Sequence, residues 1–408
     1  MRRFAVTALL VVVFAFAASL AGGRSRAVRV PSDAAGTQFG LPMQGLTAEQ
    51  RDRFESGRTA FTLQHGGVDG LGPVFNGTDC LQCHHLGGIM VSLTPGGSSE
   101  FRVTRIGRRV NNVFDPMTEF GGPVLQNNGL NEFEVPNHPF RGERVPQGAV
   151  FVSPRTSQPL FGLGLVDATP DETFIALAQM QAINDPATAG HVNVVTNLAM
   201  NTKTVGKFGW KAQVPSLFQF SGDALVNELG VTNPLFPHEN CPGGDCNELA
   251  FNPMPALNDT GDLLRRIADF MLMLGPPARG PITPDVQLGE MAFNEIGCGS
   301  CHVSTLTTGG NEIAALNHKN YHPYSDFLLH DMGSLGDGIE NDAAKGNEFR
   351  TQPLWGSRAR HSFLHDGRAT KIEDAILAHD GQGSGARERF KALDPIARAN
   401  LVKFVKSL

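Results

Sequence analysis

The sequence predicts a mainly α-helical chain with long irregular loops, folded as two domains of one type. Three observations predict this class. The pattern Cys-x-x-Cys-His occurs once in each half of the chain. Segments with apolar residues at helical spacing lie close to these patterns or end the predicted domains. Gly and Pro, with 47 and 26 of 408 residues, form about 18% of the chain against an average near 12%, which indicates many loops.

Composition excludes several classes of protein. The net charge is −6, from 34 basic and 40 acidic residues, which is too mild for a dedicated nucleic-acid-binding protein. A hydrophobic content of 41% is enough for a buried core and excludes global disorder. The length agrees with two or three domains.

The first 23 residues have the pattern of a secretory signal peptide. Arg2 and Arg3 precede an apolar run that ends near Leu20, and small residues follow. A transmembrane anchor is the alternative, because the run approaches the length that spans a bilayer. We expect a cleaved signal, a flexible lead-in over residues 24–45, and an exported, periplasmic protein with no later membrane span.

The two Cys-x-x-Cys-His patterns, at residues 80–84 and 298–302, predict two covalently bound c-type haems. Two thiols at this spacing attach to the two vinyl groups of one haem, and the following His binds the iron. Two disulfides with incidental His neighbours are the alternative, and a zinc site would leave the repeated His unexplained. The predicted haem-binding residues are therefore Cys80, Cys83, His84, Cys298, Cys301 and His302.

The remaining cysteines, Cys241 and Cys246, flank the residues Pro-Gly-Gly-Asp, and no His follows them. In an oxidising compartment this spacing favours a small disulfide-closed loop. Two free thiols are the alternative.

Amphipathic segments set the predicted domain boundaries. Residues 260–274 have the most pronounced helical pattern and end at Gly-Pro-Pro. Further helices are expected over residues 285–296 and from Asp394 to the chain end. Residues 275–284 are rich in Pro and Gly and predict a linker. The predicted units are thus residues 46–274, the linker 275–284, and residues 285–408.

A faint internal repeat suggests that the two predicted domains are cytochrome c-like domains that arose by duplication, each with one covalent c-type haem. Residues 208–212 and 363–369 each form an aromatic turn that leads into a predicted helix. The first unit also has a long excursion, from about residue 87 to residue 207, in which we expect loops and some short strands around a pocket.

Several strings of residues resemble one family, the di-haem oxidoreductases, which are relatives of the bacterial di-haem cytochrome c peroxidases. The resemblance covers about residues 45–408. The strings that carry it are residues 72–76, 162–165, 170–172, 208–212, 227–230, 330–333, 353–356 and 363–378.

This resemblance implies that the two haems have different functions. The N-terminal haem is the peroxide site, and the C-terminal haem delivers electrons. Trp210 matches a Trp that lies between the haems, and Glu228 matches a Glu of the peroxide pocket. Gln219 is the candidate for a pocket Gln, although it lies one position from the matched slot, which Phe220 occupies.

The resemblance also implies a sixth ligand for the C-terminal haem. In the relatives it lies fourteen positions after the His of an aromatic-x-His-x-Gly turn. That His is His365 here, so the ligand position is His379. A solvent-exposed His at a helix end is one alternative, and Met332 is the rival ligand. Replacing Met by His lowers a haem potential.

For the N-terminal haem we expect an open or water-occupied iron opposite His84. The family's second His, sixteen positions downstream, corresponds here to Glu100. His85 is expected at the surface or beside a haem propionate. The family's calcium site uses a Thr-x-Pro string, which is replaced here by residues 360–362, Arg-His-Ser, so calcium is doubtful.

The predicted function is an exported di-haem c-type cytochrome that reduces hydrogen peroxide, with Glu228 as general acid–base group and Trp210 as electron relay. The expected partners are peroxide and an external donor such as a small cytochrome or a cupredoxin. An electron-transfer cytochrome without substrate chemistry, and an oxygenase or oxidase acting on an organic or protein substrate, are the alternatives. A basic run is expected to pair with haem propionates or to form a solvated face: Arg102, Arg105, Arg108 and Arg109.

Overall fold

The computed structural model describes residues 39–84 and 102–408. The predicted signal peptide, most of the predicted lead-in, His85 and Glu100 lie outside these residues. Within the described part of the chain, no helix is long and apolar enough to cross a membrane.

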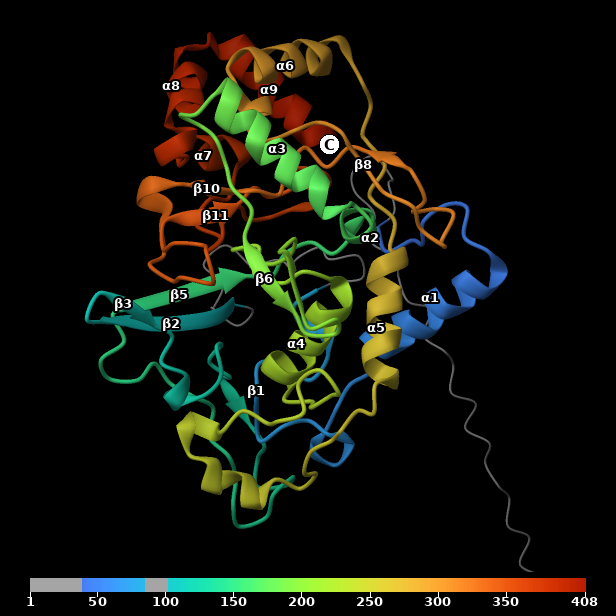
Figure 1. Ribbon diagram of the computed structural model, residues 1–408, viewed down its shortest axis with the longest axis vertical. Coiled ribbons are helices and arrows are strands. Elements are labelled where there is room, and N and C mark those ends of the chain that lie inside the picture. Colours follow the sequence, from blue (N-terminus) through green and yellow to red (C-terminus); the bar gives the residue numbers. More distant parts are fainter. Residues whose placement is uncertain (1–38, 85–101) are drawn as a thin grey trace, which may run out of the picture.

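The first unit is built on two packed helices, α1 (Ala48–Phe61) and α5 (Asp262–Met273), which lie side by side in Figure 1. The rings of Phe54 and Phe270 are 5.2 Å apart. Gly57 permits this close packing, because a Cβ there would lie 2.3 Å from the Arg266 carbonyl oxygen. α5 confirms the helix predicted over residues 260–274.

The second unit repeats this arrangement with α6 (Pro284–Glu295) and α9 (Pro395–Ser407). Thr283 and Asp394 cap these helices with their side-chain oxygens, as the sequence signals predict. Gly289 brings the helices together, since a Cβ there would lie 2.0 Å from the Asn400 carbonyl oxygen. In each unit, the helix before the Cys-x-x-Cys-His pattern therefore packs against the last helix of the unit.

The chain contains more strand than a mainly α fold predicts. Helix accounts for 36% of it and strand for 15%, so the fold is mixed. The predicted excursion provides the largest sheet, with the order β3-β2-β5. In this antiparallel sheet, seen at the left of Figure 1, Arg102 pairs with Thr156 and Arg108 with Asp115. Its strands are β2 (Arg102–Val110), β3 (Val113–Asp115) and β5 (Phe151–Thr156).

The other strands form short antiparallel pairs between the loops. They are β1 (Val74–Phe75) with β4 (Asn128–Gly129), β6 (Val194–Asn197) with β7 (Thr202–Val205), β8 (Leu306–Thr307) with β9 (Asn320–Tyr321), and β10 (Leu329–Asp331) with β11 (Glu348–Arg350). The remaining α-helices are α2 (Leu163–Asp167), α3 (Asp171–Asn184), α4 (Leu217–Leu229), α7 (Ile372–Leu377) and α8 (Ser384–Ala392).

The two aromatic turns predicted as a repeat have the same backbone conformation. Residues 208–214 and residues 363–369 are each closed by an antiparallel bridge between their first and seventh residues. Helices α4 and α7 then begin three residues after each bridge. The second and fifth residues of both turns have positive φ: Gly209 (83°) and Ala212 (49°) in the first, Leu364 (70°) and Gly367 (72°) in the second.

The main hydrophobic core crosses the predicted boundary between the units. It joins Phe161 and Phe270 of the first unit to Phe327 and Trp355 of the second. A smaller core lies between α6, α7 and α9. The segment 275–283 connects α5 to α6 without helix or strand. The two units are thus joined by a coil segment and also share buried apolar surface.

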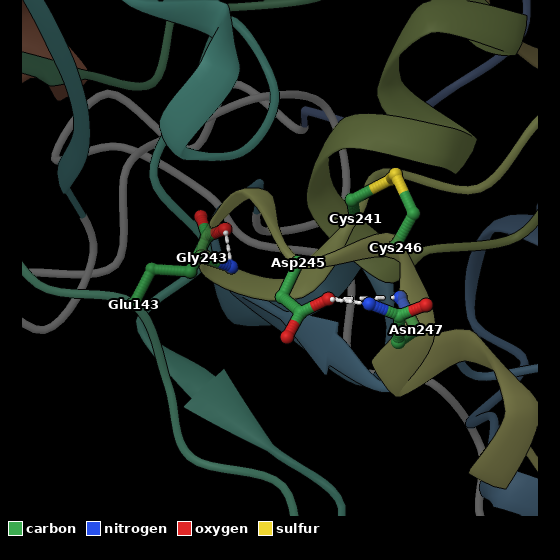
Figure 2. Close-up of a disulfide and its surroundings, with 6 residues drawn as sticks. All are labelled: Glu143, Cys241, Gly243, Asp245, Cys246 and Asn247. Atoms are coloured by element: carbon green, nitrogen blue, oxygen red, sulfur yellow. Dashed lines mark hydrogen bonds between the residues drawn. A yellow bond between two sulfur atoms is a disulfide. The ribbon is translucent and has the colours of Figure 1, made fainter.

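The predicted disulfide between Cys241 and Cys246 is confirmed (Figure 2). The loop that it closes is held to the rest of the first unit by Glu143, whose Oε1 accepts a hydrogen bond of 2.9 Å from the Gly243 N–H. Asp245 accepts hydrogen bonds from the backbone and side chain of Asn247. This cysteine pair therefore shapes a loop away from the Cys-x-x-Cys-His patterns.

A buried ionic network ties the two units together. Asp337 of the second unit accepts hydrogen bonds from Arg155 Nη2 (2.6 Å) and Ser153 Oγ (2.7 Å), both on β5. Lys211 Nζ lies 3.3 Å from the same carboxylate and donates to the Lys345 carbonyl oxygen. Burial raises the pKa of Asp337, but the two cations outweigh it and hold that pKa at about 2.

We predict that Asp337→Asn lowers the free energy of unfolding by about 3–5 kcal/mol, because it leaves two buried cations without their anion. In the unmodified protein this contribution is present above the unfolded-state pKa of Asp and is lost as the pH falls from about 4 towards 2. Urea unfolding at pH 7 measures the effect.

The matched control is Asp285→Asn, which breaks the exposed ion pair with Lys403 and should cost no more than about 1 kcal/mol. Equal losses in the two variants would contradict a structural role for the buried network.

Candidate functional site

Each Cys-x-x-Cys-His pattern lies in the wall of its own cavity. The first cavity, of about 170 Å³, is lined by Cys80, Cys83 and His84 together with Glu228 and Trp210. The second, of about 530 Å³, falls within the usual size range of ligand sites, roughly 300–1,000 Å³. Its lining includes Cys298, Cys301, His302, Met332 and His379. The structure thus brings nine of the ten predicted site residues, and also the rival ligand Met332, to the two cavities.

The first pattern begins in a short 3₁₀ helix, Cys80–Gln82, capped by the side chain of Asp79. Burial raises the pKa of the Cys80 thiol to about 12, so it is not the reactive thiolate of a redox pair. Burial also lowers the pKa of His84 to about 4. A neutral imidazole at neutral pH is the form that binds metal ions.

Glu228 lies in the last turn of α4 and faces the first cavity. The helix is fixed at both ends, by the Ser216 side chain at its start and by the left-handed Gly230 after it. Asn76 Nδ2 donates to Glu228 Oε2 at 2.9 Å. Burial raises the pKa of Glu228 to about 7, and the neighbouring Asp223 adds to the shift. A carboxyl group with this pKa can accept and release protons near neutral pH.

Gln219 does not line the first cavity, which corrects the expectation drawn from sequence. Its side chain is buried on another face of α4, where Oε1 accepts from the Leu198 N–H at 2.8 Å and Nε2 donates to the Thr196 carbonyl oxygen. Both ends of the amide are therefore used to hold the β6 region. Phe220, its neighbour, lines the cavity instead.

Trp210 forms part of the walls of both cavities. Its indole Nε1 donates a hydrogen bond of 2.9 Å to the Thr156 carbonyl oxygen, which fixes the ring. On the side of the second cavity, its ring lies edge-on to His365, with centroids 6.3 Å apart. The two rings occupy the third position of the two repeated turns, so the duplicated turns meet at the joint between the cavities.

In the second cavity, two histidines have one ring nitrogen engaged by the backbone. His302 Nδ1 is 2.9 Å from the Tyr324 carbonyl oxygen, and His379 Nδ1 is 2.7 Å from that of Ala375. Such contacts fix the tautomer and leave Nε2 as the metal-binding atom. Burial lowers the pKa of both rings, that of His302 to about 4.

The repeat relates one residue that lines the first cavity to one that lines the second. His379 lies fourteen positions after His365, and the same count from Trp210 leads to Ala224 in α4. Ala224 lines the first cavity. A methyl group therefore occupies, in the first unit, the position that an imidazole occupies in the second.

Unpaired buried guanidinium nitrogens test whether these residues fit haem. Among the described residues, Nη1 of Arg155, Nη1 of Arg350, and Nε and Nη2 of Arg360 have no hydrogen-bond partner. Arg155 and Arg350 line the first cavity, and Arg350 and Arg360 the second. Buried cations need anionic partners, and haem carries two propionates. The thiol, imidazole and guanidinium groups that line each cavity thus match those that a haem binds.

Sequence reasoning missed several groups at these walls. Asp223 and Asn76 flank Glu228, but no short motif links them, because Asn76 comes from a distant turn. His330 forms a buried pair with Asp326, 3.0 Å apart, and its Nδ1 lies 3.6 Å from Cys301 Sγ. Burial acts to lower the pKa of His330, but the Asp326 carboxylate outweighs it and raises that pKa well above its usual value.

The predicted basic run divides between two roles. All four arginines lie on β2. Arg105 lines the first cavity, where its charge acts to lower the pKa of Glu228. Arg108 pairs with Asp115 and Glu119, and Arg109 with Glu340, outside the cavities. One arginine of the run thus faces a site, and two form surface ion pairs.

Three solved structures are distantly similar to the chain. The hydrazine synthase of Kuenenia stuttgartiensis, studied under 20 bar of xenon, is 14% identical over 90% of each chain, with a TM-score of 0.43. A MauG-like protein associated with microbial copper homeostasis is 12% identical over 93% of each chain (TM-score 0.40). The diheme peroxidase BthA from Burkholderia thailandensis E264 is 13% identical over 93% of this chain and 92% of its own (TM-score 0.34). Similarities this remote carry no argument.

Among curated proteins, none matches the chain significantly. The protein family described as "Di-haem oxidoreductase, putative peroxidase" matches residues 131–408, well over half of the chain. Two haems, as the family description implies, agree with two cavities that each contain a Cys-x-x-Cys-His pattern and unpaired guanidinium groups. This chain belongs to the di-haem oxidoreductase family.

Proposed function

We propose that this protein is an exported di-haem c-type cytochrome that reduces hydrogen peroxide beside Glu228, with electrons that arrive through the second haem. The observation that carries the proposal is the position of Trp210, which walls both cavities, next to a first cavity that contains a carboxyl group of pKa about 7. The first cavity thereby has a proton-transferring group, Glu228. The second cavity adjoins the first through the shared Trp210.

The proposal assigns covalent attachment to the four free cysteines. Cys80 and Cys83 would hold the first haem, and Cys298 and Cys301 the second, with His84 and His302 as iron ligands. Each haem, when bound, supplies an iron that exchanges single electrons, and an iron with an open position also binds peroxide. The buried arginines would hold the propionates.

We propose that His379, together with His302, would bind the iron of a haem in the C-terminal unit. It shares the cavity with His302, and the Ala375 carbonyl oxygen fixes its Nδ1, so that Nε2 is available. Met332 lines the same cavity, but its position in a loop gives it no comparable orientation. Two imidazole ligands would hold this haem at a low potential, suited to donating electrons.

In the N-terminal unit, Ala224 is proposed to leave the iron that His84 would bind without a second protein ligand. Its methyl group offers no ligand, and peroxide has access to the space beside Glu228. Glu228 would take the proton from one peroxide oxygen and return it to the other, which leaves as water. Complete reduction consumes two electrons and two further protons and gives two waters.

The proposed electron path runs from an external donor to the second unit and through Trp210 to the first. A small cytochrome or a cupredoxin is the kind of donor expected, because single electrons must be delivered outside the cell membrane. Export is proposed from the signal-like residues 1–23. Gln219 takes no part, since both ends of its amide are bound to backbone groups.

We predict that Glu228→Gln lowers peroxide turnover by about 10² or more, because the amide cannot accept the proton. In the unmodified protein, turnover should rise as the pH increases through about 7, where the carboxyl group becomes ionised. In the variant this rise should be absent. Steady-state assays with a reduced donor between pH 5 and 9 measure both effects, and unchanged turnover would remove Glu228 from the mechanism.

His379→Ala should convert the second haem from low-spin to high-spin, because one axial ligand is lost. Electron paramagnetic resonance of the oxidised protein measures the change. The control is Met332→Leu, which should leave the spectrum unaltered. The opposite pair of results would assign the ligand to Met332.

Ala224→His is the reciprocal variant. It should place an imidazole opposite His84, make the first haem low-spin and stop peroxide turnover. Ala224→Ser, whose side chain is too short to bind the iron, is the matched control and should keep the high-spin signal. If the His variant retained the high-spin signal, positions 224 and 379 would not be equivalent.

A further inference from the structure

Arg350 occupies an unusual position between the two sites. It lies at the end of β11 and lines both cavities, as do Trp210 and Gln352. Only 4% of the residue is exposed. Because it reaches both cavities, its charge acts on both.

The guanidinium group is held rigidly by neutral partners. Its Nε donates to the Gly209 carbonyl oxygen at 2.8 Å, and Nη2 donates to Gln352 Oε1 at 3.3 Å. The Arg350 backbone N–H donates to the Trp210 carbonyl oxygen at 2.9 Å. Arg350 thereby binds the repeated turn at two consecutive carbonyl oxygens, that of Gly209 through its side chain and that of Trp210 through its backbone.

Arg350 has no carboxylate partner among the described residues, and its Nη1 is buried without any hydrogen bond. Asp326 acts on its pKa only through its charge, because the Asp326 carboxylate is bound by His330, Gln181 and the Leu328 N–H. Burial lowers the pKa of Arg350 to about 9. A buried guanidinium without an anion is costly, so the group needs an anionic ligand.

We infer that Arg350 is a shared propionate-binding residue at the joint between the two cavities, and that its charge sets the reduction potentials of both haems together. Guanidinium groups suit carboxylate ligands, because their N–H donors have a fixed planar geometry. This inference rests on the presence of two haems and is independent of peroxide as substrate.

Two other arginines with unpaired buried nitrogens line one cavity each. Arg360 has two unpaired nitrogens and lines only the second cavity, and Arg155 lines only the first. Arg155 is also bound to Asp337. Arg360 is therefore the matched control, a buried guanidinium that faces one site.

The test is a spectroelectrochemical titration of the haem-loaded protein, without peroxide. Arg350→Met removes the charge and introduces no polar group in its place. Each haem should become harder to reduce, because a nearby positive charge favours the added electron. We expect each reduction equilibrium constant to fall about tenfold, a shift of about 59 mV for a one-electron couple.

Two further variants complete the test. Arg360→Met should shift only the second haem, and Arg350→Lys, which keeps the charge, should leave both potentials close to those of the unmodified protein. Arg350→Gln repeats the measurement if the Met variant fails to load haem. A shift of one potential alone, or of neither, on removal of the Arg350 charge would overturn the inference. Loss of peroxide turnover alone would bear on the proposed function and not on this inference.

Discussion

The shared wall between the two cavities is the constraint on which the rest of the structure depends. The turn at residues 208–214 forms this wall, and it is held from both units. Trp210 is bound to the Thr156 carbonyl oxygen through its ring and to the Arg350 N–H through its backbone. Lys211, the next residue, joins Asp337 and the backbone of the second unit. Two cavities can exchange electrons through one side chain only if that side chain is fixed.

A duplication would explain why the same type of turn is found beside two cavities with different lining residues. Both turns have the same bridge and the same left-handed positions, and each leads into a helix that faces a cavity. The difference lies in single residues at equal spacing. Under the proposed ligation, the imidazole at position 379 would be a ligand in the second unit, whereas the methyl group at position 224 would leave space in the first, and Glu228 lies one turn further along α4. A closed and an open site can thus arise from one scaffold.

Much of this arrangement was predictable from sequence, because it depends on local patterns. The two Cys-x-x-Cys-His patterns, helices α5, α6 and α9, and the disulfide each have a short-range signal that the structure matches. The strands β2 and β5 were underestimated, since loops rich in Gly and Pro hide their pairing over about fifty residues. Gln219 was misplaced because a one-residue shift on a helix turns a side chain by about 100°.

Other parts of the site have no local signal. Arg350, Arg155 and Asp337 come together only through tertiary folding, and their importance appears only in their burial and in the atoms left without partners. Asn76 reaches Glu228 from a turn about 150 positions earlier in the chain. Sequence reasoning identified the chemistry of the patterns but could not identify the charges that surround them.

The most direct test of the account is the spin state of each haem in the unmodified protein, measured by electron paramagnetic resonance in the fully oxidised and half-reduced forms. We predict one low-spin haem with two imidazole ligands in the second unit, and one high-spin haem, open to peroxide, in the first unit. Two haems that remain low-spin at every redox level would contradict it and would favour an electron-transfer cytochrome without substrate chemistry.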